Sequence, residues 1–375
     1  DNGRDIQIIL NGTFSPEIYN TENGEIKPIK AEYREEKTII RYRIFGYDSI
    51  LLKLVDGKTD CEKAQYIPEK SSEMLCEMCD YELSEENILV LDMAEFKIEG
   101  EEEFSPKEEI LRLDNICRER LGLRERGEAI VQPWVYGEAP DVSKVTLRYT
   151  FNSEIDYDGA FLGLEDAEKA EIIFNGEKVS NEIVDNYVDF SIYKVKLGKI
   201  KKGENELVIT YPFGPSANLE TVFVLGCFGV RVVGTQSTVI ALPEKIGFGE
   251  ILSQGFPFYS GAITYKIPVN VENGSIEVET SDYRGGLITV EVDGEKKGRI
   301  IYSPYTLEIN DIENGEHEIG VKLYTHRYNS FGPIHLVNEK ESWHGPGAWR
   351  STGINWSYEY VLRKTGILKA PVIRL

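Results

Sequence analysis

The chain has few cysteines, the residues that form disulfides and bind zinc as thiolates. Its 375 residues include only five cysteines, an odd number, so no framework of disulfides is indicated. Cys76 and Cys79 form one C-x-x-C pair, and together with Cys61 they offer one thiolate fewer than a closed zinc site needs. No β-α-β pattern surrounds the pair, which argues against a thioredoxin-like redox site.

Positive charge is also scarce. The sequence has 64 acidic residues against 42 Lys and Arg, which gives a formal net charge of −22. Proteins that bind nucleic acids contact phosphates through clustered Lys and Arg, so we expect no nucleic-acid partner. The acidic surface favours solubility, and it is also compatible with neutral substrates or with bound calcium.

A long apolar segment is missing as well. The longest hydrophobic stretch, residues 221–233, contains Arg231 and is shorter than the roughly 20 residues of a membrane span, so we expect no membrane partner. The first residues show neither an initiator Met nor a signal-peptide pattern. We expect a piece of a longer protein, and the lack of disulfide patterning favours a cytoplasmic over a secreted location.

Motifs of several enzyme classes do not occur. There is no G-x-S-x-G nucleophile turn, no phosphate-binding P-loop, and no glycine-rich turn that opens a helix for a dinucleotide. The four histidines, His317, His326, His335 and His344, all lie near the C-terminus. For His335 and His344 we favour structural roles, with a metal site as the alternative.

What the sequence does contain is β-strand patterning. Apolar and polar residues alternate in short runs, such as residues 37–45, 144–151 and 286–292, and these runs are separated by Gly, Asn and Asp turns. The turns recur at about the 8–12-residue spacing of β-sandwiches. Strands do not alternate with amphipathic helices, so a parallel α/β sheet or barrel is excluded. The sequence therefore predicts an all-β fold.

One helix is predicted over residues 105–125. Ser105 is the expected N-cap, Pro106 the first helical residue, and Glu108 completes a capping box. Gly122 can adopt the left-handed conformation that ends a helix. The residues expected on its apolar face are Ile110, Leu113, Ile116, Cys117 and Leu121.

A pattern in the middle of the chain recurs near its end. The first copy has the dipeptide Asn175-Gly176 and then a Gly-Glu-Asn-Glu turn at residues 203–206. The second has Asp293-Gly294 and then a Gly-Glu-His-Glu turn at residues 315–318. Both dipeptides suit two-residue hairpins with positive φ, and an alternating strand follows each later turn. We infer two consecutive β-sandwiches of one kind.

This repeated pattern resembles the galactose-binding-like jelly-roll domains of large multidomain glycoside hydrolases. Residues 254–271, 303–311 and 329–336 also resemble segments that follow the catalytic domain in α-L-rhamnosidase-like and family-two-like enzymes. The resemblance implies tandem β-sandwich domains joined by one helix. The expected parts are an N-terminal β-sandwich (1–104), the connecting helix (105–125), and two galactose-binding-like jelly rolls (126–233 and 234–375).

In enzymes of this kind the catalytic carboxylates lie in an upstream barrel domain, and no barrel pattern occurs here. The resemblance therefore implies a non-catalytic C-terminal portion of a glycoside hydrolase, whose partners are the upstream catalytic domain of the same polypeptide and carbohydrate. One alternative is a free-standing carbohydrate-binding or adhesion protein. Another is a chain that is itself a catalyst, although no spacing among its acidic residues singles out a catalytic pair.

The expected carbohydrate site lies in residues 341–360. Sugars stack their C–H faces on aromatic rings and hydrogen-bond their hydroxyls to polar side chains, and this glycine-rich segment holds three of the four Trp residues. The candidate residues are Trp343, His344, Trp349, Arg350 and Asn355. Trp356, Tyr358 and Tyr360 alternate instead, which predicts a core strand over residues 354–362.

A structural calcium ion is the one cofactor considered. Jelly rolls of this kind hold such cations in loops of carboxylates and backbone carbonyls. Glu154, Asp156 and Asp158 supply candidate ligands, although their spacing is not that of an EF-hand. The alternative is a solvated acidic loop.

Overall fold

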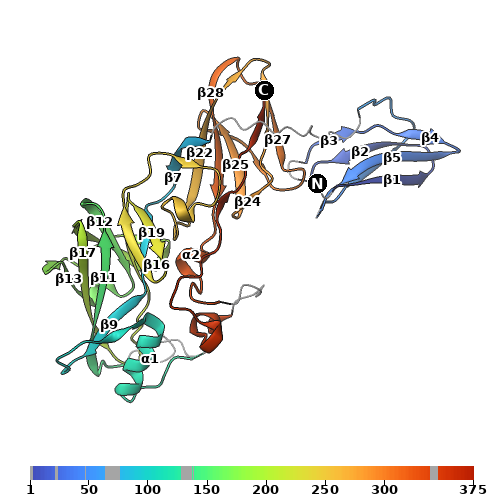
Figure 1. Ribbon diagram of the computed structural model, residues 1–375. Coiled ribbons are helices and arrows are strands. Elements are labelled where there is room, and N and C mark those ends of the chain that lie inside the picture. Colours follow the sequence, from blue (N-terminus) through green and yellow to red (C-terminus); the bar gives the residue numbers. More distant parts are fainter. Residues whose placement is uncertain are drawn as a thin grey trace.

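The computed structural model describes residues 3–21, 24–46, 48–63, 77–127, 137, 139–337 and 345–375. The protein is all-β, with three β-sheet units in a row and one longer helix, α1 (Ile110–Arg120), at the end away from the N-terminus (Figure 1). No helix in the described parts of the chain is long and apolar enough to cross a membrane.

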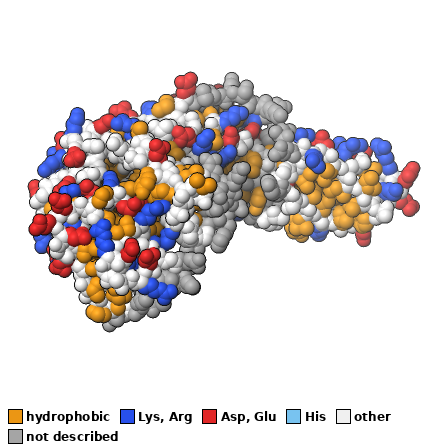
Figure 2. Space-filling model, turned by 60° about the horizontal axis from the view of Figure 1, so that its bottom comes forward, with side chains coloured by type: hydrophobic (Ala, Val, Ile, Leu, Met, Phe, Trp, Pro, Cys, Tyr) orange, Lys and Arg blue, Asp and Glu red, His pale blue; other side chains and the backbone are white. Residues whose placement is uncertain are grey.

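The N-terminal unit consists of two three-stranded antiparallel sheets. Their strand orders are β1 (Arg4–Asn11), β5 (Lys37–Ile44), β4 (Glu32–Arg34), and β3 (Ile26–Pro28), β2 (Phe14–Tyr19), β6 (Leu52–Asp56). Its interior is thin, because Ile29 and Ile40 are the only buried hydrophobic residues among those described there. Figure 2 shows hydrophobic side chains gathered on the surface of this unit, at the right of the view.

The middle sandwich has two sheets that enclose the larger hydrophobic core. One has the order β10 (Ser105–Glu109), β9 (Met93–Ile98), β11 (Ser143–Ser153), β17 (Gly203–Phe213), β13 (Glu171–Phe174), β14 (Glu177–Val179), and is extended through β20 (Gln236–Ile240) to β19 (Gly229–Val233). The other has the order β15 (Ile183–Tyr187), β16 (Asp189–Ile200), β12 (Tyr157–Leu164), β18 (Val222–Gly226), β8 (Asn87–Leu91).

The C-terminal sandwich encloses a second core. Its larger sheet has the order β21 (Ile246–Gly247), β7 (Met78–Leu83), β22 (Ala262–Val271), β28 (Gly315–Tyr324), β25 (Leu287–Val292), β26 (Glu295–Ile300). The smaller sheet has the order β27 (Thr306–Asn310), β23 (Ser275–Glu279), β30 (Val372–Arg374), and β24 (Tyr283–Arg284) pairs separately with β29 (Gly366–Ile367).

The repeated sequence pattern corresponds to a repeated topology. The order β11-β17-β13-β14 in the middle sandwich has its counterpart in β22-β28-β25-β26 in the C-terminal one. Asn175 and Gly176 have φ of 50° and 82°, and Asp293 and Gly294 have φ of 51° and 80°. Positive φ at both residues is what a two-residue turn between right-twisted strands requires, so the two predicted hairpins are confirmed.

The unit expected over residues 1–104 is divided among all three parts of the fold, which corrects the domain boundaries. After β6 the chain enters the C-terminal sandwich, where β7 pairs with β22, and then the middle sandwich, where β8 pairs with β18 and β9 with β11. Each pairing joins strands far apart in sequence. The period-two pattern identifies a strand but does not identify its partner.

The predicted helix start is also wrong by four residues, since the N-cap is Glu109 and not Ser105. Ser105–Glu109 form the edge strand β10, in which Ser105 lies opposite Phe96 of β9. Pro106 is tolerated because an edge strand leaves one row of N–H groups unpaired. Glu109 is the N-cap, and its carboxylate accepts hydrogen bonds from the N–H groups of Leu111 and Arg112, each at 3.1 Å. Gly122 has φ of 67°, as expected for the residue that ends the helix.

The C-terminal segment, defined here as residues 325–337 and 345–362, leaves the C-terminal sandwich and packs on the middle one. It contains α2 (Tyr328–Phe331) and the 3-10 helices η4 (Pro346–Arg350) and η5 (Gly353–Asn355). Ile334 belongs to the core of the middle sandwich, with Tyr360 packed against it. The strand expected over residues 354–362 does not form: Trp356 makes a single β-bridge, to Leu336.

Candidate functional site

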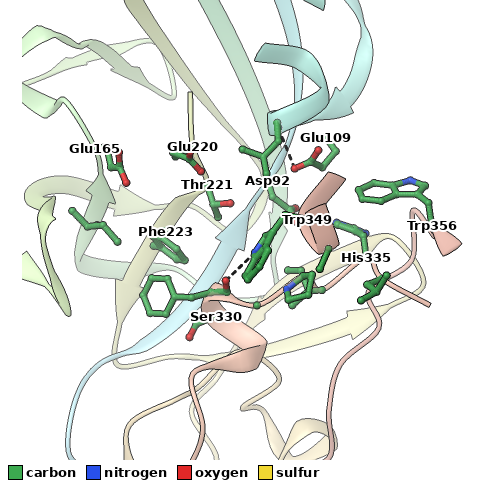
Figure 3. Close-up of a pocket in the computed structure, with 18 residues that line it drawn as sticks. Asp92, Glu109, Glu165, Glu220, Thr221, Phe223, Ser330, His335, Trp349 and Trp356 are labelled. Carbon is green, nitrogen blue, oxygen red and sulfur yellow. Dashed lines mark hydrogen bonds and ion pairs between the residues drawn. The ribbon is translucent and has the colours of Figure 1, made fainter. Parts of the chain in front are cut away.

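A cavity of about 120 Å³ lies between the middle sandwich, the start of α1 and the C-terminal segment (Figure 3). Its lining comes from separate elements: the turn between β8 and β9, the N-cap of α1, the residues after β12, those before β18, and the C-terminal segment. One wall of the cavity is therefore made by residues 330–336, with Trp349 and Trp356 beside them.

Four aromatic rings line the cavity: Phe223, Phe331, Trp349 and Trp356. The indole N–H of Trp349 donates to the carbonyl oxygen of Phe331 at 3.1 Å, which fixes the ring. The Trp356 ring lies under the guanidinium of Arg112, with the carbon 3.8 Å from the ring centre. Its own N–H is buried and has no hydrogen-bond acceptor in the described parts of the chain. The site thus offers flat apolar faces and one unused donor.

Four carboxyl groups also line the cavity. Figure 3 shows Glu165 and Glu220 together on one side of it, with Glu109 and Asp92 farther along. Burial raises the pKa of Glu109 to about 7, with the negative charge of Asp92 adding to the effect. Burial likewise raises the pKa of Glu165 to about 7, reinforced by Glu220 and opposed by a 2.6 Å hydrogen bond from Asn218. Near neutral pH both carboxyls exist partly as proton donors.

A buried ion network holds the carboxyl-bearing elements in place. Asp114 of α1 is fully buried, and its Oδ2 lies 2.9 Å from Nε of Arg118 and 3.6 Å from Nη1 of Arg126. Arg126 also donates to Glu220 at 2.9 Å. Arg118 donates to the carbonyl oxygens of Pro215 and Ala217, in the loop that precedes β18. The network therefore fixes α1, which carries Glu109 at its start, against the loop that carries Glu220.

A second polar group joins the middle sandwich to the C-terminal segment. Asp92 lies in the turn between β8 and β9, and its Oδ2 is 3.0 Å from Nε2 of His335. Its Oδ1 accepts a hydrogen bond from the hydroxyl of Tyr360 at 2.9 Å. The His335 ring lies between those of Trp356 and Tyr360, with centroids 4.7 and 5.2 Å away. These contacts hold the wall formed by residues 330–336 in position.

The structure brings some of the predicted carbohydrate residues to the cavity and leaves others away from it. Trp349 lines the cavity. The adjacent Arg350 donates at 3.3 Å to the carbonyl of Leu111, which also lines it. Asn355 is exposed and does not line it. Trp343 and His344 lie outside the described residues. Trp356, expected in a core strand, lines the cavity instead.

The sequence did not single out the four carboxyl groups, whereas for His335 it favoured a structural role, with a metal site as the alternative. The carboxyl groups come from elements far apart in the chain, and with 64 acidic residues no spacing selects these four. One local indication existed for Glu109, since an acidic residue directly before a helical pattern is a candidate N-cap.

The three proposed calcium ligands do not converge. Glu154 pairs with Arg231 at 2.5 Å, Asp156 accepts from the N–H of Lys202 at 3.2 Å, and Asp158 accepts from the N–H of Gly159 at 2.9 Å. Nowhere in the described residues do three or more His, Cys, Asp or Glu side chains form a group able to hold a metal ion. Cys79 is buried, and Cys76 lies outside the described residues.

Comparisons with known proteins give distant structural similarity only. No protein-family model matches the chain, and no curated protein does. Among solved structures it is similar to a rhamnosidase from Novosphingobium sp. PP1Y, with 14% identity and a TM-score of 0.26 over 69% of this chain and 26% of that chain. It is also similar to a β-D-mannosidase from Dictyoglomus thermophilum, with 12% identity and a TM-score of 0.23 over 64% of this chain and 31% of that one.

A third similar structure is a GH2 β-galacturonidase from Eisenbergiella tayi, with 11% identity and a TM-score of 0.23 over 64% of this chain and 36% of that one. The chain thus spans 26–36% of the length of these three enzymes. Identities and TM-scores this low carry no argument about function, which has to come from the cavity itself.

Proposed function

We propose that this chain is a non-catalytic C-terminal portion of a glycoside hydrolase, and that its cavity holds one neutral sugar residue of the glycan. The observation that carries the proposal is the meeting of two indole rings with hydrogen-bonding side chains in one cavity. Ligand sites in proteins are concave and largely apolar, with a few polar groups that orient the ligand, and this cavity has that character. The sandwiches would also support the upstream catalytic domain.

A neutral sugar fits the chemistry of the lining. The C–H face of a pyranose can stack on the ring of Trp349 or Trp356, whereas its hydroxyls both donate and accept hydrogen bonds. One hydroxyl oxygen can accept the buried N–H of Trp356, and others can donate to the carboxyl groups. The negative charge of Glu220 is already balanced by Arg126, and that of Asp92 is shared with His335. A cationic ligand is therefore not required.

A non-catalytic role is supported by how the carboxyl groups are used. A glycosidase needs two carboxyl groups on opposite sides of the sugar, free to transfer protons or to attack. Here the carboxylate of Glu109 caps α1, Glu220 binds Arg126, and Glu165 binds Asn218. Each of these groups thus already has a structural partner among the described residues, which supports a binding role for the cavity.

The proposal can be tested by titrating the full chain with neutral monosaccharides in a calorimeter and by assaying it with 4-nitrophenyl glycosides. We expect saturable heat with at least one sugar and no release of nitrophenol. Release of nitrophenol would establish that the chain is itself a catalyst. Absence of both would reject the cavity as a sugar site.

The alternative of a free-standing carbohydrate-binding protein shares the same cavity and differs in its genetic context. The sequence encoded upstream of Asp1 separates the two. A barrel domain there supports the hydrolase assignment, and a start codon near Asp1 supports the free-standing protein.

A further inference from the structure

Both ring nitrogens of His335 face oxygen atoms in a buried place. Nδ1 lies 2.7 Å from the carbonyl oxygen of Ser357, and Nε2 lies 3.0 Å from Oδ2 of Asp92. His335 is 4% exposed and Asp92 is 3% exposed. A carbonyl only accepts hydrogen bonds, so Nδ1 must carry a hydrogen. A second proton is then needed between Nε2 and the carboxylate, because otherwise a lone pair would face a negative charge.

This proton lies at the junction of three elements. Asp92 belongs to the middle sandwich, and its backbone carbonyl accepts a hydrogen bond from the N–H of Ile110 at the start of α1. His335, Ser357 and Tyr360 belong to the C-terminal segment, which forms one wall of the cavity. Contact between Asp92 and His335 therefore fixes that wall to the rest of the site.

We propose that Asp92 and His335 form a proton-operated clasp, which holds the C-terminal segment against the middle sandwich when the pair carries its proton and releases it when the proton leaves. The consequence for ligand affinity rests on the proposed function, because it assumes that a sugar occupies the cavity. The opening of the wall itself does not depend on any ligand.

The pKa of His335 is the balance of burial and of the charged and titratable groups around the clasp. Burial lowers the pKa of His335, but the hydrogen bond and the charge of Asp92, with a smaller effect of Glu109, raise it by more, so its pKa lies above the ordinary 6.5. The pKa of Glu109 is itself raised by burial to about 7. Tyr149 and Tyr360 have pKa values well above 10 because they are buried, and they stay neutral in this range. The guanidinium of Arg112 stacks on Trp356 nearby.

The sign of the pH effect follows from these shifts. A group whose pKa is raised in the closed state contributes stability that is complete below its ordinary pKa and is lost as the pH rises through the raised value. This holds for His335 above pH 6.5 and for Glu109 between pH 4.5 and about 7. Both groups therefore close the wall on acidification and open it on alkalinisation.

The first test is a proton NMR titration of the imidazole signals of the full chain. Only four histidines are present, so His335→Gln assigns its own signal by difference. We expect His335 to titrate above pH 6.5. A midpoint at or below 6.5, or an Asp92→Asn variant with an unchanged midpoint, overturns the proposal.

The second test is amide hydrogen exchange of residues 334–337 and 356–361, with measured rates divided by the intrinsic rates at each pH. We expect protection to fall about 10-fold or more between pH 6 and pH 8.5, since the hydrogen bond between two charged groups is lost. His335→Gln should remove the part of this dependence above about pH 7, and leave only the part that Glu109 contributes below it. The matched control is His317→Gln, which breaks the His317–Asp293 pair of the C-terminal sandwich. This variant should leave the pH dependence of exchange in the C-terminal segment unchanged.

The third test separates the clasp from the ligand. Sugar affinity should weaken about 10-fold over the same pH range in the unmodified chain. In His335→Gln it should no longer change above about pH 7, where Glu109 has finished titrating. If no sugar binds at any pH, the proposed function fails while the NMR and exchange results still decide the clasp. If a sugar binds with the same pH dependence in both proteins, the clasp does not control the site.

Discussion

Asn175 and Asn205 are hydrogen-bonded through their side chains at the hairpin end of the middle sandwich, where Nδ2 of Asn175 donates to Oδ1 of Asn205 at 2.9 Å. At the corresponding place in the C-terminal sandwich, Nδ1 of His317 lies 2.6 Å from Oδ2 of Asp293. Both pairs join the turn residue of a hairpin to the third residue of a Gly-Glu-x-Glu turn. Both sandwiches therefore join these two turns through a side-chain pair. The pair is neutral in the middle sandwich and titratable in the C-terminal one.

The hydrogen bonds around the two pairs also correspond. The N–H of Asn175 donates to the carbonyl of Glu206, and the N–H of Asp293 donates to the carbonyl of Glu318, both at 2.9 Å. The side chains of the turn reach back four residues as well: Nδ2 of Asn205 donates to the carbonyl of Lys201, and Nε2 of His317 to the carbonyl of Glu313, both at 2.7 Å. Equivalent bonds at equivalent spacings explain why the pattern recurs in the sequence.

Replacing Asn205 by Ala should destabilise the middle sandwich by about 2–3 kcal/mol. Asn205 is fully buried and also donates to the carbonyl of Gly203 and accepts from the N–H of Lys201, so the variant removes several side-chain hydrogen bonds to the backbone of this turn. The measurement is the free energy of unfolding from hydrogen exchange in β17. Asn310→Ala, at an exposed position, is the control and should change stability by less than about 0.5 kcal/mol. Equal effects of the two variants would show that the hydrogen bonds of Asn205 do not stabilise the middle sandwich.

The His317–Asp293 pair should make the stability of its hairpin depend on pH, whereas the neutral Asn175–Asn205 pair should not. The pKa of His317 is raised chiefly by its hydrogen bond to Asp293, so its contribution is lost as the pH rises from 6.5 through the raised value. The pKa of Asp293 is lowered, chiefly by the N–H of Glu318, so its contribution is lost as the pH falls from 3.8 through the lowered value. The pair therefore contributes fully between about pH 4 and 6.5.

This window can be measured by thermal unfolding of the C-terminal sandwich between pH 3 and 9, followed by exchange in β28. His317→Asn, which copies the residue at the matching place in the middle sandwich, should remove the decline above pH 6.5. A decline of the same size in that variant would show that another group is responsible.

The parts of the fold that local sequence decides were predicted correctly. Asn175-Gly176 and Asp293-Gly294 specify their own turns, because positive φ is a property of two adjacent residues. The start of α1 was missed because residues 105–109 pair with β9, and that pairing overrides a capping pattern of equal quality. The domain boundary was missed for the same reason, since the partner of β7 lies far along the chain.

The site was predicted only in part. Trp349 was chosen because three of the four Trp residues lie in one glycine-rich segment, and the structure places it in the lining of the cavity. Trp356 was assigned to a strand because Tyr358 and Tyr360 alternate with it, yet no ladder forms there. Asp92, Glu109 and the other two carboxyl groups come from separate elements that the fold brings together. Their spacing in the sequence therefore does not predict that they line one cavity.

Replacing Asp114 by Asn should cost about 3–5 kcal/mol, because it leaves the buried guanidinium groups of Arg118 and Arg126 without their shared countercharge. The change should appear in urea unfolding as a lower midpoint, together with loss of exchange protection in α1. Glu171→Gln serves as the control, since its pair with Lys144 is exposed and contributes about 0–1 kcal/mol. A small effect of Asp114→Asn would indicate that α1 is held by its apolar face alone.

Replacing Val188 by Gly should stabilise the chain by about 1 kcal/mol. Val188 joins β15 to β16 with φ of 62°, a conformation in which a β-branched side chain is strained and glycine is not. The matched control is Val184→Gly on the same hairpin, where φ is not positive and the change should destabilise by about 0.5–1 kcal/mol. Both are measured as shifts in the midpoint of urea unfolding. Destabilisation by Val188→Gly would show that the side chain contributes more by contact than it costs in strain.

The most direct measurement is saturation-transfer NMR of the full chain with a set of neutral monosaccharides near pH 6, comparing the unmodified protein with Trp349→Ala and Asn355→Ala. We expect transfer to the ring protons of at least one sugar, its loss in Trp349→Ala, and its persistence in Asn355→Ala, because Trp349 lines the cavity and Asn355 does not. Transfer that survives Trp349→Ala, or no transfer to any sugar, would contradict the assignment of this cavity as a sugar-binding site.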